Sequence, residues 1–480
     1  MTVTPRCTDL FQTRRELHHF LRRYQQLSKD KNQPQIVSLS IEISAVDPLV
    51  VLQALTKAKP LHFYMEKRAF GQEIYPHKGL AIAAIGAAAK LVVSGTDRFT
   101  EAQQFIHSTL AHTAIYGSTH LPLTGPHFFC SFTFFDQSSD SKAAFPAATI
   151  VLPEWQVSKN EQHCFVVANI VLHAATKLEE TVDRLWQTWQ IIRSIQYEFV
   201  TAAIEHRDLL TRRDITDTRH FKQAVRAALT AIHQATFHKV VLAHAVDVAS
   251  PLPFDAIASL HQLRTLHPGC YLFLTNNEQG QQFLGASPER LVSVRNGQLE
   301  TGALAGSAPR GKTPHDDAVF AQRLLASVKE RHEHRVVSQF IGQQLAQLGL
   351  SSQLSPVRLL RLSNIQHLQT PIHATVPAEL PLLDIVAALH PTPAVAGMPR
   401  SLACDYIRRY EPFERSLYAA PIGWVDHHGN GEFAVGIRSA LLHGNQARLF
   451  AGAGIVEGSD PDRELAEVQL KLQALLQALV

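Results

Sequence analysis

The grouping of strands and helices along the chain is the feature that most restricts its fold. Near the C-terminal end, three β-rich runs at 418–426, 432–442 and 447–456 are separated by glycine-containing turns, which predicts an antiparallel meander. Elsewhere, too, strands and helices occur in groups, whereas a doubly wound parallel sheet requires strict alternation. The sequence therefore predicts an α+β fold.

Hydrophobic periodicity and turn residues predict the other main elements. A polar stretch at 207–217 is interpreted as the boundary between two halves, residues 1–215 and 216–480. The Asn296-Gly297 pair predicts a tight hairpin turn between its two flanking strands. The predicted helices are 1–30, 179–204, 218–235, 317–348 and 383–390, and the predicted strands include 35–44, 237–249, 271–275, 282–286, 291–295 and 298–304.

Composition excludes several classes of protein. The chain has 480 residues, 45% of them hydrophobic and 18% charged, which is typical of a globular protein. The net charge of +3 does not suggest a nucleic-acid partner. The longest apolar run, 79–93, is too short to span a bilayer and contains Lys90, and the first thirty residues lack the apolar core of a signal peptide. Five widely spaced cysteines without a CxxC pair argue against zinc and disulfides. We expect a cytoplasmic protein with no membrane partner.

The last thirty residues contain the first candidate site. A glycine-rich strand, 451–456, leads into a helix on which Glu464, Glu467 and Lys471 share one face. Glycines allow a ligand to approach the backbone closely, and carboxylates can hold a hard cation. The alternative is an ordinary Glu–Lys pair on a solvated helix.

A second pair of glutamates matches the first. Glu330 and Glu333 stand three residues apart in the predicted helix 317–348, as Glu464 and Glu467 do in theirs. Two such helices would bring four carboxylates around one cation. Neither has the ExxH pattern of a di-iron bundle, so an all-oxygen site for Mg²⁺ is favoured.

Four further residues have side chains suited to chemistry, each with a structural alternative. Lys239, in a predicted strand, would be a usable base if its amine is desolvated, but a lysine in such a strand is usually an edge or snorkelling residue. Glu289 follows a proline in a turn, and its structural alternative is an ion pair with Arg290. Ser307 ends a strand of small residues, which either allow close packing or line a cavity with Ser307 as a hydrogen-bond donor. Arg438 suits a substrate carboxylate or a cross-strand ion pair.

Taken together, these segments resemble the chorismate-utilising enzymes, which include isochorismate, salicylate, anthranilate and aminodeoxychorismate synthases. The resemblance covers about 216–479. It implies one large α+β fold with central β-sheets and outer helices, in which residues 1–215 form the variable N-terminal half. The matching segments are 237–243, 283–291, 303–307, 329–334, 390–395, 418–424, 436–439 and 451–471.

The resemblance also implies roles for individual residues. Glu333 and Glu467 would be the Mg²⁺ ligands, with Glu464 and Glu330 close by. Lys239 would deprotonate a water that attacks C2 of chorismate, and Glu289 would protonate the departing C4 hydroxyl, since hydroxide leaves poorly without an acid. The residues implied in substrate binding are Ser307, His390, Tyr418, Arg438, Gly452, Gly454 and Lys471.

Two positions at which the chain differs from particular members of the family restrict the reaction that is expected. Ala305 stands where aminodeoxychorismate synthases carry a nucleophilic lysine, and ammonia-using members typically lack a base at the position of Lys239. Water is therefore the expected nucleophile, so that an isochorismate synthase is the first expectation and a salicylate synthase the second. Ser307 and Ala396 replace a usual threonine and glycine, which affects substrate positioning.

Three further expectations concern the biological setting. The long N-terminal half favours a menaquinone or phylloquinone pathway over a siderophore pathway. A monomer or weak homodimer is expected. An inactive, chorismate-binding relative is the non-enzymatic alternative, and the completeness of the base, acid, metal ligands and carboxylate-binding residues argues against it.

Overall fold

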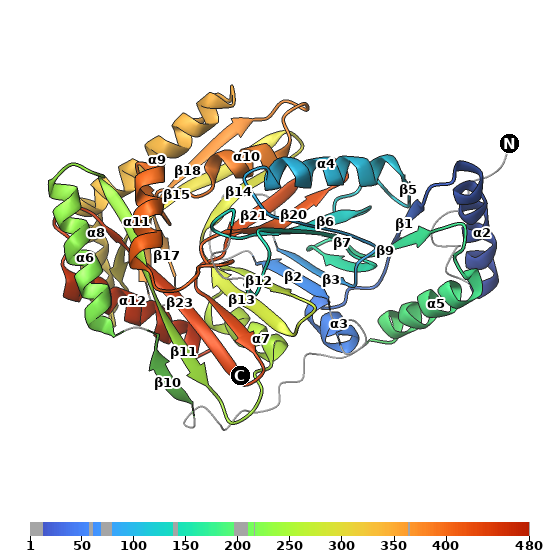
Figure 1. Ribbon diagram of the computed structural model, residues 1–480, viewed down its shortest axis with the longest axis horizontal. Helices are drawn as coiled ribbons and strands as arrows, with labels where there is room; N and C mark the ends of the chain where they lie inside the picture. Colours follow the sequence, from blue (N-terminus) through green and yellow to red (C-terminus); the bar gives the residue numbers. More distant parts are fainter. Residues whose placement is uncertain are drawn as a thin grey trace.

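Two large β-sheets pack together in the centre of the molecule, with helices on the outside (Figure 1). The computed structural model describes residues 13–56, 61–68, 79–137, 143–195, 210–215, 217–362 and 365–479. Among the strand pairings of these residues, only that of β1 with β5 is parallel. A mainly antiparallel arrangement with grouped helices confirms the predicted α+β class.

The first sheet has 13 strands within the described residues. In spatial order they are β10 (Thr211–Asp214), β11 (Lys239–Ala249), β23 (Gln446–Ile455), β22 (Ser439–His443), β13 (Gln281–Ser287), β12 (Tyr271–Asn276), β2 (His62–Lys67), β3 (Leu80–Ile85), β8 (Trp155–Lys159), β9 (Cys164–Leu172), β1 (Gln35–Glu42) and β5 (Thr113–Tyr116), with β19 (Gly397–Met398) paired to β11.

The second sheet has 10 strands in the same described part. Their order is β16 (Gln353–Leu354), β18 (Ile365–Thr375), β15 (Gln298–Pro309), β14 (Arg290–Arg295), β21 (Gly431–Val435), β20 (Pro421–Asp426), β6 (His127–Phe132), β7 (Ala148–Leu152) and β4 (Ala89–Val93), with β17 (Arg358–Arg361) paired to β18.

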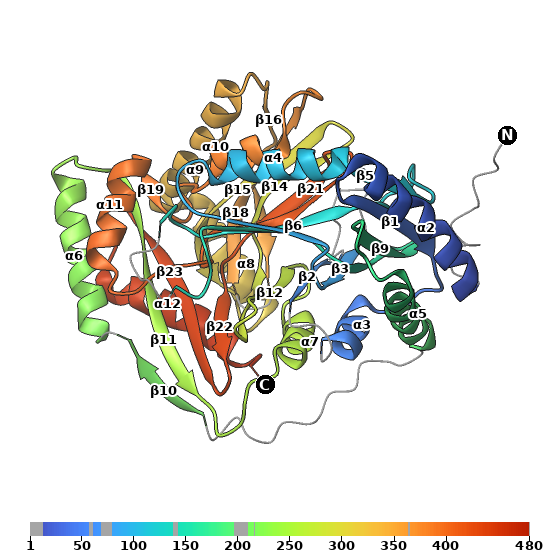
Figure 2. The ribbon, with the colours of Figure 1, turned by 45° about the vertical axis from the view of Figure 1, so that its right-hand side comes forward.

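Helices flank the sheets and cluster at both ends of the molecule. In both ribbon views α6 and α12 lie at one end and α2 and α5 at the other (Figure 2). No helix in the described part of the chain is long and apolar enough to cross a membrane. The helices are α2 (Arg14–Lys31), α3 (Pro48–Leu55), α4 (Arg98–Ala111), α5 (Leu178–Ser194), α6 (Thr218–His233), α7 (Ala256–Leu266), α8 (Pro314–Ala326), α9 (Val328–Gln347), α10 (Leu382–Leu389), α11 (Arg400–Tyr410) and α12 (Pro461–Leu476).

Strands from both halves of the sequence build each sheet. In the first sheet β2 pairs with β12, and in the second β6 pairs with β20. Buried apolar side chains from both halves belong to one continuous core. The division at residue 215 therefore separates two parts of the sequence whose strands interleave in space.

Several predicted elements are confirmed. Helix α6 and strand β1 fall where the periodicity places them. The hairpin of β14 and β15 turns at Asn296 and Gly297, whose φ angles are 50° and 72°. Positive φ at both central residues is what a type I′ turn requires, and the Asn-Gly pair tolerates it.

The predicted meander is wrong. The run 432–442 is not one strand: it divides into β21 in the second sheet and β22 in the first. The connection passes through Arg438, whose φ of 50° lies in the left-handed region and bends the chain between the sheets. Alternating apolar residues continue through this bend, so the sequence pattern does not reveal it.

Two helix boundaries also differ from the prediction. The predicted helix 317–348 is two helices, α8 and α9, separated at Ser327. Ser327 has an extended conformation, and its hydroxyl accepts a hydrogen bond from the Glu330 backbone, so it caps the start of α9. Helix α5 ends at Ser194, short of the predicted 204. Residues 196–204 lie outside the described residues, as do 1–12 of the first predicted helix.

Candidate functional site

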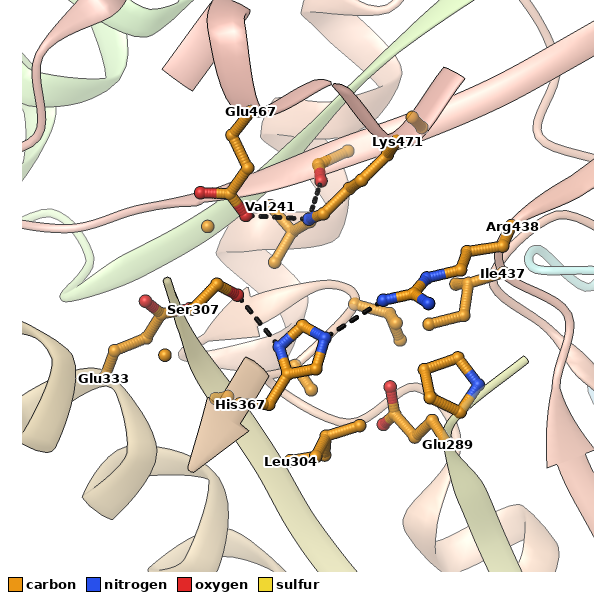
Figure 3. A pocket seen from close by; sticks show the side chains of 18 of the residues that line it. Val241, Glu289, Leu304, Ser307, Glu333, His367, Ile437, Arg438, Glu467 and Lys471 are labelled. Atoms are coloured by element: carbon orange, nitrogen blue, oxygen red, sulfur yellow. Dashed lines mark hydrogen bonds and ion pairs between the residues drawn. The ribbon is translucent and has the colours of Figure 1, made fainter. Parts of the chain in front are cut away.

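A cavity of about 90 Å³ lies where strands of both sheets meet helices α9 and α12 (Figure 3). Its polar side chains come from segments that are far apart in the sequence. It is lined by Val241, Pro288, Glu289, Leu304, Ala305, Gly306, Ser307, Lys329, Glu330, Glu333, His367, Ala394, Val395, Tyr418, Ile437, Arg438, Phe450, Ala451, Gly452, Gly454, Glu464, Glu467 and Lys471.

Strand β23 forms one wall with almost no side chains. A Cβ atom at Gly454 would lie 2.4 Å from the Glu333 Oε1 atom, and one at Gly452 would lie 2.9 Å from the Tyr418 hydroxyl. Both glycines are therefore required for these neighbours to approach the backbone. The Gly452 carbonyl accepts a hydrogen bond of 2.8 Å from Lys471.

Lys239 is fully buried at the start of β11, with an exposed fraction of 0%. Its Nζ atom donates to Glu333 Oε1 at 2.8 Å, and a Cβ atom at Gly454 would lie 3.1 Å from its Cε atom. Lys239 is thus buried in an ion pair with Glu333, and it is not among the residues that line the cavity. The alternative of an exposed edge lysine is wrong.

The two predicted ExxE helices bring four carboxylates to the same cavity. All four of these glutamates are paired with lysines, and Lys329 lies 3.7 Å from Glu330 as well as close to Glu464. Besides the Lys239–Glu333 pair, Lys329 lies 2.9 Å from Glu464, and Lys471 lies 2.8 Å from Glu467. The predicted i, i+4 pair on α12 therefore exists, but it faces a cavity instead of solvent.

The carboxylates repel one another. Burial, with a further contribution from the Glu333 charge, raises the pKa of Glu330 to about 7. Burial also raises the pKa of Glu464, against the opposing effect of Lys329. Burial would raise the pKa of Glu467 as well, but the Lys471 ammonium holds it below its usual value. The positive charge of Lys471 thus favours the ionised form of Glu467.

The described residues contain no group of three or more His, Cys, Asp or Glu side chains arranged to hold a metal ion. The predicted ligands Glu333, Glu467 and Glu464 therefore share a cavity but do not form a preorganised cluster. A Mg²⁺ ion typically uses only one or two protein carboxylates and keeps several waters. The oxygen donors present fit that requirement.

Glu289 is buried at the edge of the cavity, directly after β13. The predicted alternative, a pair with Arg290, is wrong, because Arg290 forms ion pairs with Glu300 and Glu432. Burial raises the pKa of Glu289 to about 7, although the charges of Lys239 and Lys471 oppose the shift. A carboxyl group with this pKa can hold a proton near neutral pH and release it, as a general acid must.

His367 joins two of the predicted substrate-binding residues, as the dashed lines in Figure 3 mark. Its Nε2 atom lies 3.0 Å from Arg438 Nη2, and its Nδ1 atom lies 3.0 Å from Ser307 Oγ. Burial and the Arg438 charge lower the pKa of His367 well below its usual value, so the ring is neutral.

The hydrogen-bond directions follow from this arrangement. Arginine can only donate, so Nε2 of His367 accepts, and the proton of the neutral ring must be on Nδ1. Nδ1 then donates to Ser307 Oγ, which leaves the hydroxyl hydrogen of Ser307 free to point into the cavity. Arg438 and Ser307 are thereby both oriented as donors toward an anionic ligand.

His367 is a site residue that was not predicted from the sequence. It lies in the β-rich segment 365–375, where a lone histidine is indistinguishable from an ordinary core residue. Its role follows from the pairing of β15 with β18, which sets Ser307 opposite His367. No signal in a single sequence gives that register across 60 residues.

His390, predicted to bind substrate, does not line this cavity. Its Nε2 atom lies 3.0 Å from the Phe134 carbonyl oxygen, and burial lowers the pKa of the ring to about 3. The structure therefore does not bring His390 together with the other predicted substrate-binding residues, and its role stays a prediction. The other predicted substrate-binding residues, Ser307, Tyr418, Arg438, Gly452, Gly454 and Lys471, all line the cavity.

Comparisons with known proteins agree with this geometry. Residues 20–480 match the family model described as chorismate binding enzyme. The salicylate biosynthesis isochorismate synthase of Pseudomonas aeruginosa is 34% identical over 464 residues, covering 93% of this chain and 91% of that protein. The isochorismate synthase MenF of Bacillus subtilis is 30% identical over 479 residues, 97% of each chain.

Solved structures show the same fold. The menaquinone-specific isochorismate synthase MenF of Escherichia coli superposes with a TM-score of 0.73 at 27% identity, covering 95% of this chain and all of that one. Anthranilate synthase component I of Streptococcus pneumoniae, at 21% identity, has a TM-score of 0.67 and shares the fold. A family match across nearly the whole chain and relatives of this coverage show that the protein belongs to the chorismate-binding enzymes.

Proposed function

We propose that the protein is an isochorismate synthase, an isomerase that converts chorismate to isochorismate. The observation that carries the proposal is a cavity lined by a carboxyl group with a pKa of about 7 and by a separate set of anion-binding donors, with the buried Lys239 paired to Glu333 of the lining. The curated relatives that span this chain are named isochorismate synthases, which supports the same reaction.

One set of residues would bind and orient the substrate. Arg438, Lys471 and Ser307 would bind the carboxylates of chorismate, with the neutral His367 orienting two of these donors. Tyr418, stacked on Phe450 at a centroid distance of 5.2 Å, would orient the enolpyruvyl arm.

Acid and base act on different ring positions. Lys239 would remove a proton from the water that attacks C2. Glu289 would give its proton to the C4 hydroxyl, which then leaves as water. One hydroxyl is exchanged for another, and the proton taken up by Lys239 balances the one lost by Glu289.

Magnesium is proposed as the cofactor, held by Glu333 and Glu467 with Glu464 nearby. A bound Mg²⁺ would supply positive charge for the ring carboxylate of the substrate. Burial, with a further contribution from the charges of Glu333 and Glu467, raises the pKa of Glu330 to about 7, so a cation at this place would favour its ionised form. Oxygen donors are the ligands that Mg²⁺ prefers.

Replacing Glu467 with glutamine should weaken Mg²⁺ binding, because a neutral amide takes the place of an anionic oxygen. We expect about a tenfold loss of affinity, which corresponds to about 1.4 kcal/mol. The measurement is the Mg²⁺ concentration that gives half of the thermal stabilisation. Glu457→Gln is the matched control, since Glu457 is exposed and does not line the cavity. Catalytic activity that is unchanged by EDTA would contradict a magnesium site.

Product analysis tests the proposed reaction. Incubation with chorismate and Mg²⁺ should give a mixture of chorismate and isochorismate with little pyruvate, because the exchange of hydroxyls on similar dienes has little driving force. The same mixture should form from isochorismate. Salicylate with an equal amount of pyruvate would instead identify a salicylate synthase, and anthranilate from ammonia would exclude water as the nucleophile.

The isochorismate formed is proposed to serve quinone biosynthesis. The match to MenF proteins in both sequence and structure supports this assignment. The relative named for salicylate biosynthesis also spans this chain, so the length of the N-terminal half does not by itself separate the two pathways. Restoration of menaquinone synthesis in a bacterium lacking its own enzyme would support the quinone pathway, and failure of an expressed, active protein to do so would contradict it.

A further inference from the structure

Directly behind the cavity wall lies a buried ion pair between Arg415 and Glu411. Both residues belong to the segment between α11 and β20, and their side chains are 1% and 3% exposed. The arginine Nε atom donates to Glu411 Oε2 at 2.8 Å, and Nη2 donates to Oε1 at 2.5 Å. Neither residue lines the cavity.

The pair is bonded to two other segments of backbone. Arg415 Nη1 donates to the Val395 carbonyl at 2.7 Å, and Nη2 donates to the Val241 carbonyl at 2.8 Å. Glu411 Oε1 also accepts from the Ala243 backbone amide at 2.7 Å. One ion pair thus connects strand β11 to the loop after α10.

Aromatic rings enclose the guanidinium. Its carbon atom lies 4.4 Å from the ring centroid of Phe134 and 5.7 Å from that of Tyr418. The Phe134 carbonyl oxygen is in turn the hydrogen-bond partner of His390, which holds the Phe134 segment in place. The Tyr418 backbone amide donates to the Arg415 carbonyl at 2.8 Å.

Three residues held in this way form part of the cavity lining: Val241, Val395 and Tyr418. They come from β11, from the loop after α10 and from the turn before β20. The planar guanidinium offers five donors in a fixed geometry, so it defines the distances between these segments more closely than apolar packing would.

The energetics favour a role other than stability. Burying two charges costs several kcal/mol in desolvation, and an ion pair recovers this cost only with good geometry, so hydrophobic residues would often be equally stable. The Arg415–Glu411 pair is therefore best explained by the geometry that it imposes on the cavity. A displacement of about 1 Å in a binding wall can reduce the rate roughly 10²-fold.

We propose that Arg415 is a positioning residue, which acts with Glu411 to fix Val241, Val395 and Tyr418 against the ring and enolpyruvyl arm of the substrate. The identity of this substrate rests on the proposed function. Arg415 touches no reacting atom. It fixes three residues of the cavity that also contains the donors Arg438 and Lys471, so that a substrate anchored by its carboxylates has one orientation relative to Glu289.

The experiment compares Arg415→Lys with Arg264→Lys. Arg264 is a matched control because it is also buried, at 7% exposure, and pairs with Asp47 and Glu66, none of which lines the cavity. Both substitutions keep the positive charge but remove the planar guanidinium with its paired donors, so both should lower the Tm. Only Arg415→Lys should raise the KM for chorismate and lower kcat/KM, by roughly 10²-fold. The pH dependence of kcat should stay that of the wild type in both.

Several outcomes separate this role from a purely structural one. Equal kinetic constants for the two variants would overturn the role of Arg415. If Arg415→Lys does not fold, Glu411→Gln is the variant to measure. It keeps the shape of the Glu411 side chain but weakens its two hydrogen bonds with Arg415. A wild-type KM in Glu411→Gln would overturn the proposal. A wild-type protein that forms no isochorismate overturns the proposed function, whereas a wild-type enzyme whose two variants behave alike overturns the positioning role alone.

Discussion

Replacement of Lys239 by alanine should reduce kcat by roughly 10²–10⁴-fold, the usual effect of losing a general base. The KM for chorismate should change little, because the carboxylate-binding residues Arg438, Lys471 and Ser307 stay in place. The reason for so large an effect is that Lys239 is fully buried beside Glu333, at 2.8 Å. The measurement is the steady-state rate of isochorismate formation by protein whose fold is verified by circular dichroism.

The Lys239→Arg variant tests whether Lys239 acts as a general base or only as a counter-ion of Glu333. Arginine keeps the positive charge next to Glu333 but stays protonated at any accessible pH. We expect this variant to be as inactive as Lys239→Ala. Lys222→Ala is the control, because Lys222 pairs with Asp462 away from the cavity. Near-normal turnover by a folded Lys239→Arg protein would exclude Lys239 as the base.

Glu289→Gln should have a comparable effect, again roughly 10²–10⁴-fold on kcat, because an amide cannot protonate the leaving hydroxyl. The pH profile gives the more specific prediction. The pKa of Glu289 is raised to about 7 by burial, so the acid form predominates below that pH and the carboxylate above it. Wild-type kcat/KM should therefore fall as the pH rises through about 7.

In Glu289→Gln this alkaline decline should disappear, since the group that titrates is gone. Profiles of kcat/KM between pH 5.5 and about 9 test the assignment. If kcat/KM of Glu289→Gln declined with the same midpoint pH as that of the wild type, the titration would belong to another group. Glu278→Gln serves as a control, because Glu278 is exposed and pairs with Lys90 outside the cavity.

The sequence predicted those parts of the site that depend on local spacing. Glutamates three residues apart on a helix must share a face, and Glu330, Glu333, Glu464 and Glu467 all line the cavity. The glycines of β23 predicted a bare wall, and that wall exists. In each case the geometry of a single element was sufficient.

Features that depend on distant segments were not predicted. His367 acts through Ser307 and Arg438, which are 60 and 71 residues away. The bend at Arg438 moves the chain from one sheet to the other while the apolar pattern continues, so a meander was wrongly predicted. The break at Ser327 depends on a single capping serine between two amphipathic helices. Sheet register and side-chain pairing decide such features, and one sequence does not specify them.

The central claim is that water attacks C2 of chorismate and that the C4 hydroxyl is lost. The most direct measurement is the reaction in H₂¹⁸O, with mass analysis of isochorismate isolated at low conversion. The mechanism proposed for Lys239 and Glu289 predicts one solvent-derived ¹⁸O in the product, located on C2. Isochorismate that contains no ¹⁸O would mean that the original hydroxyl is transferred within the substrate, and would contradict the account.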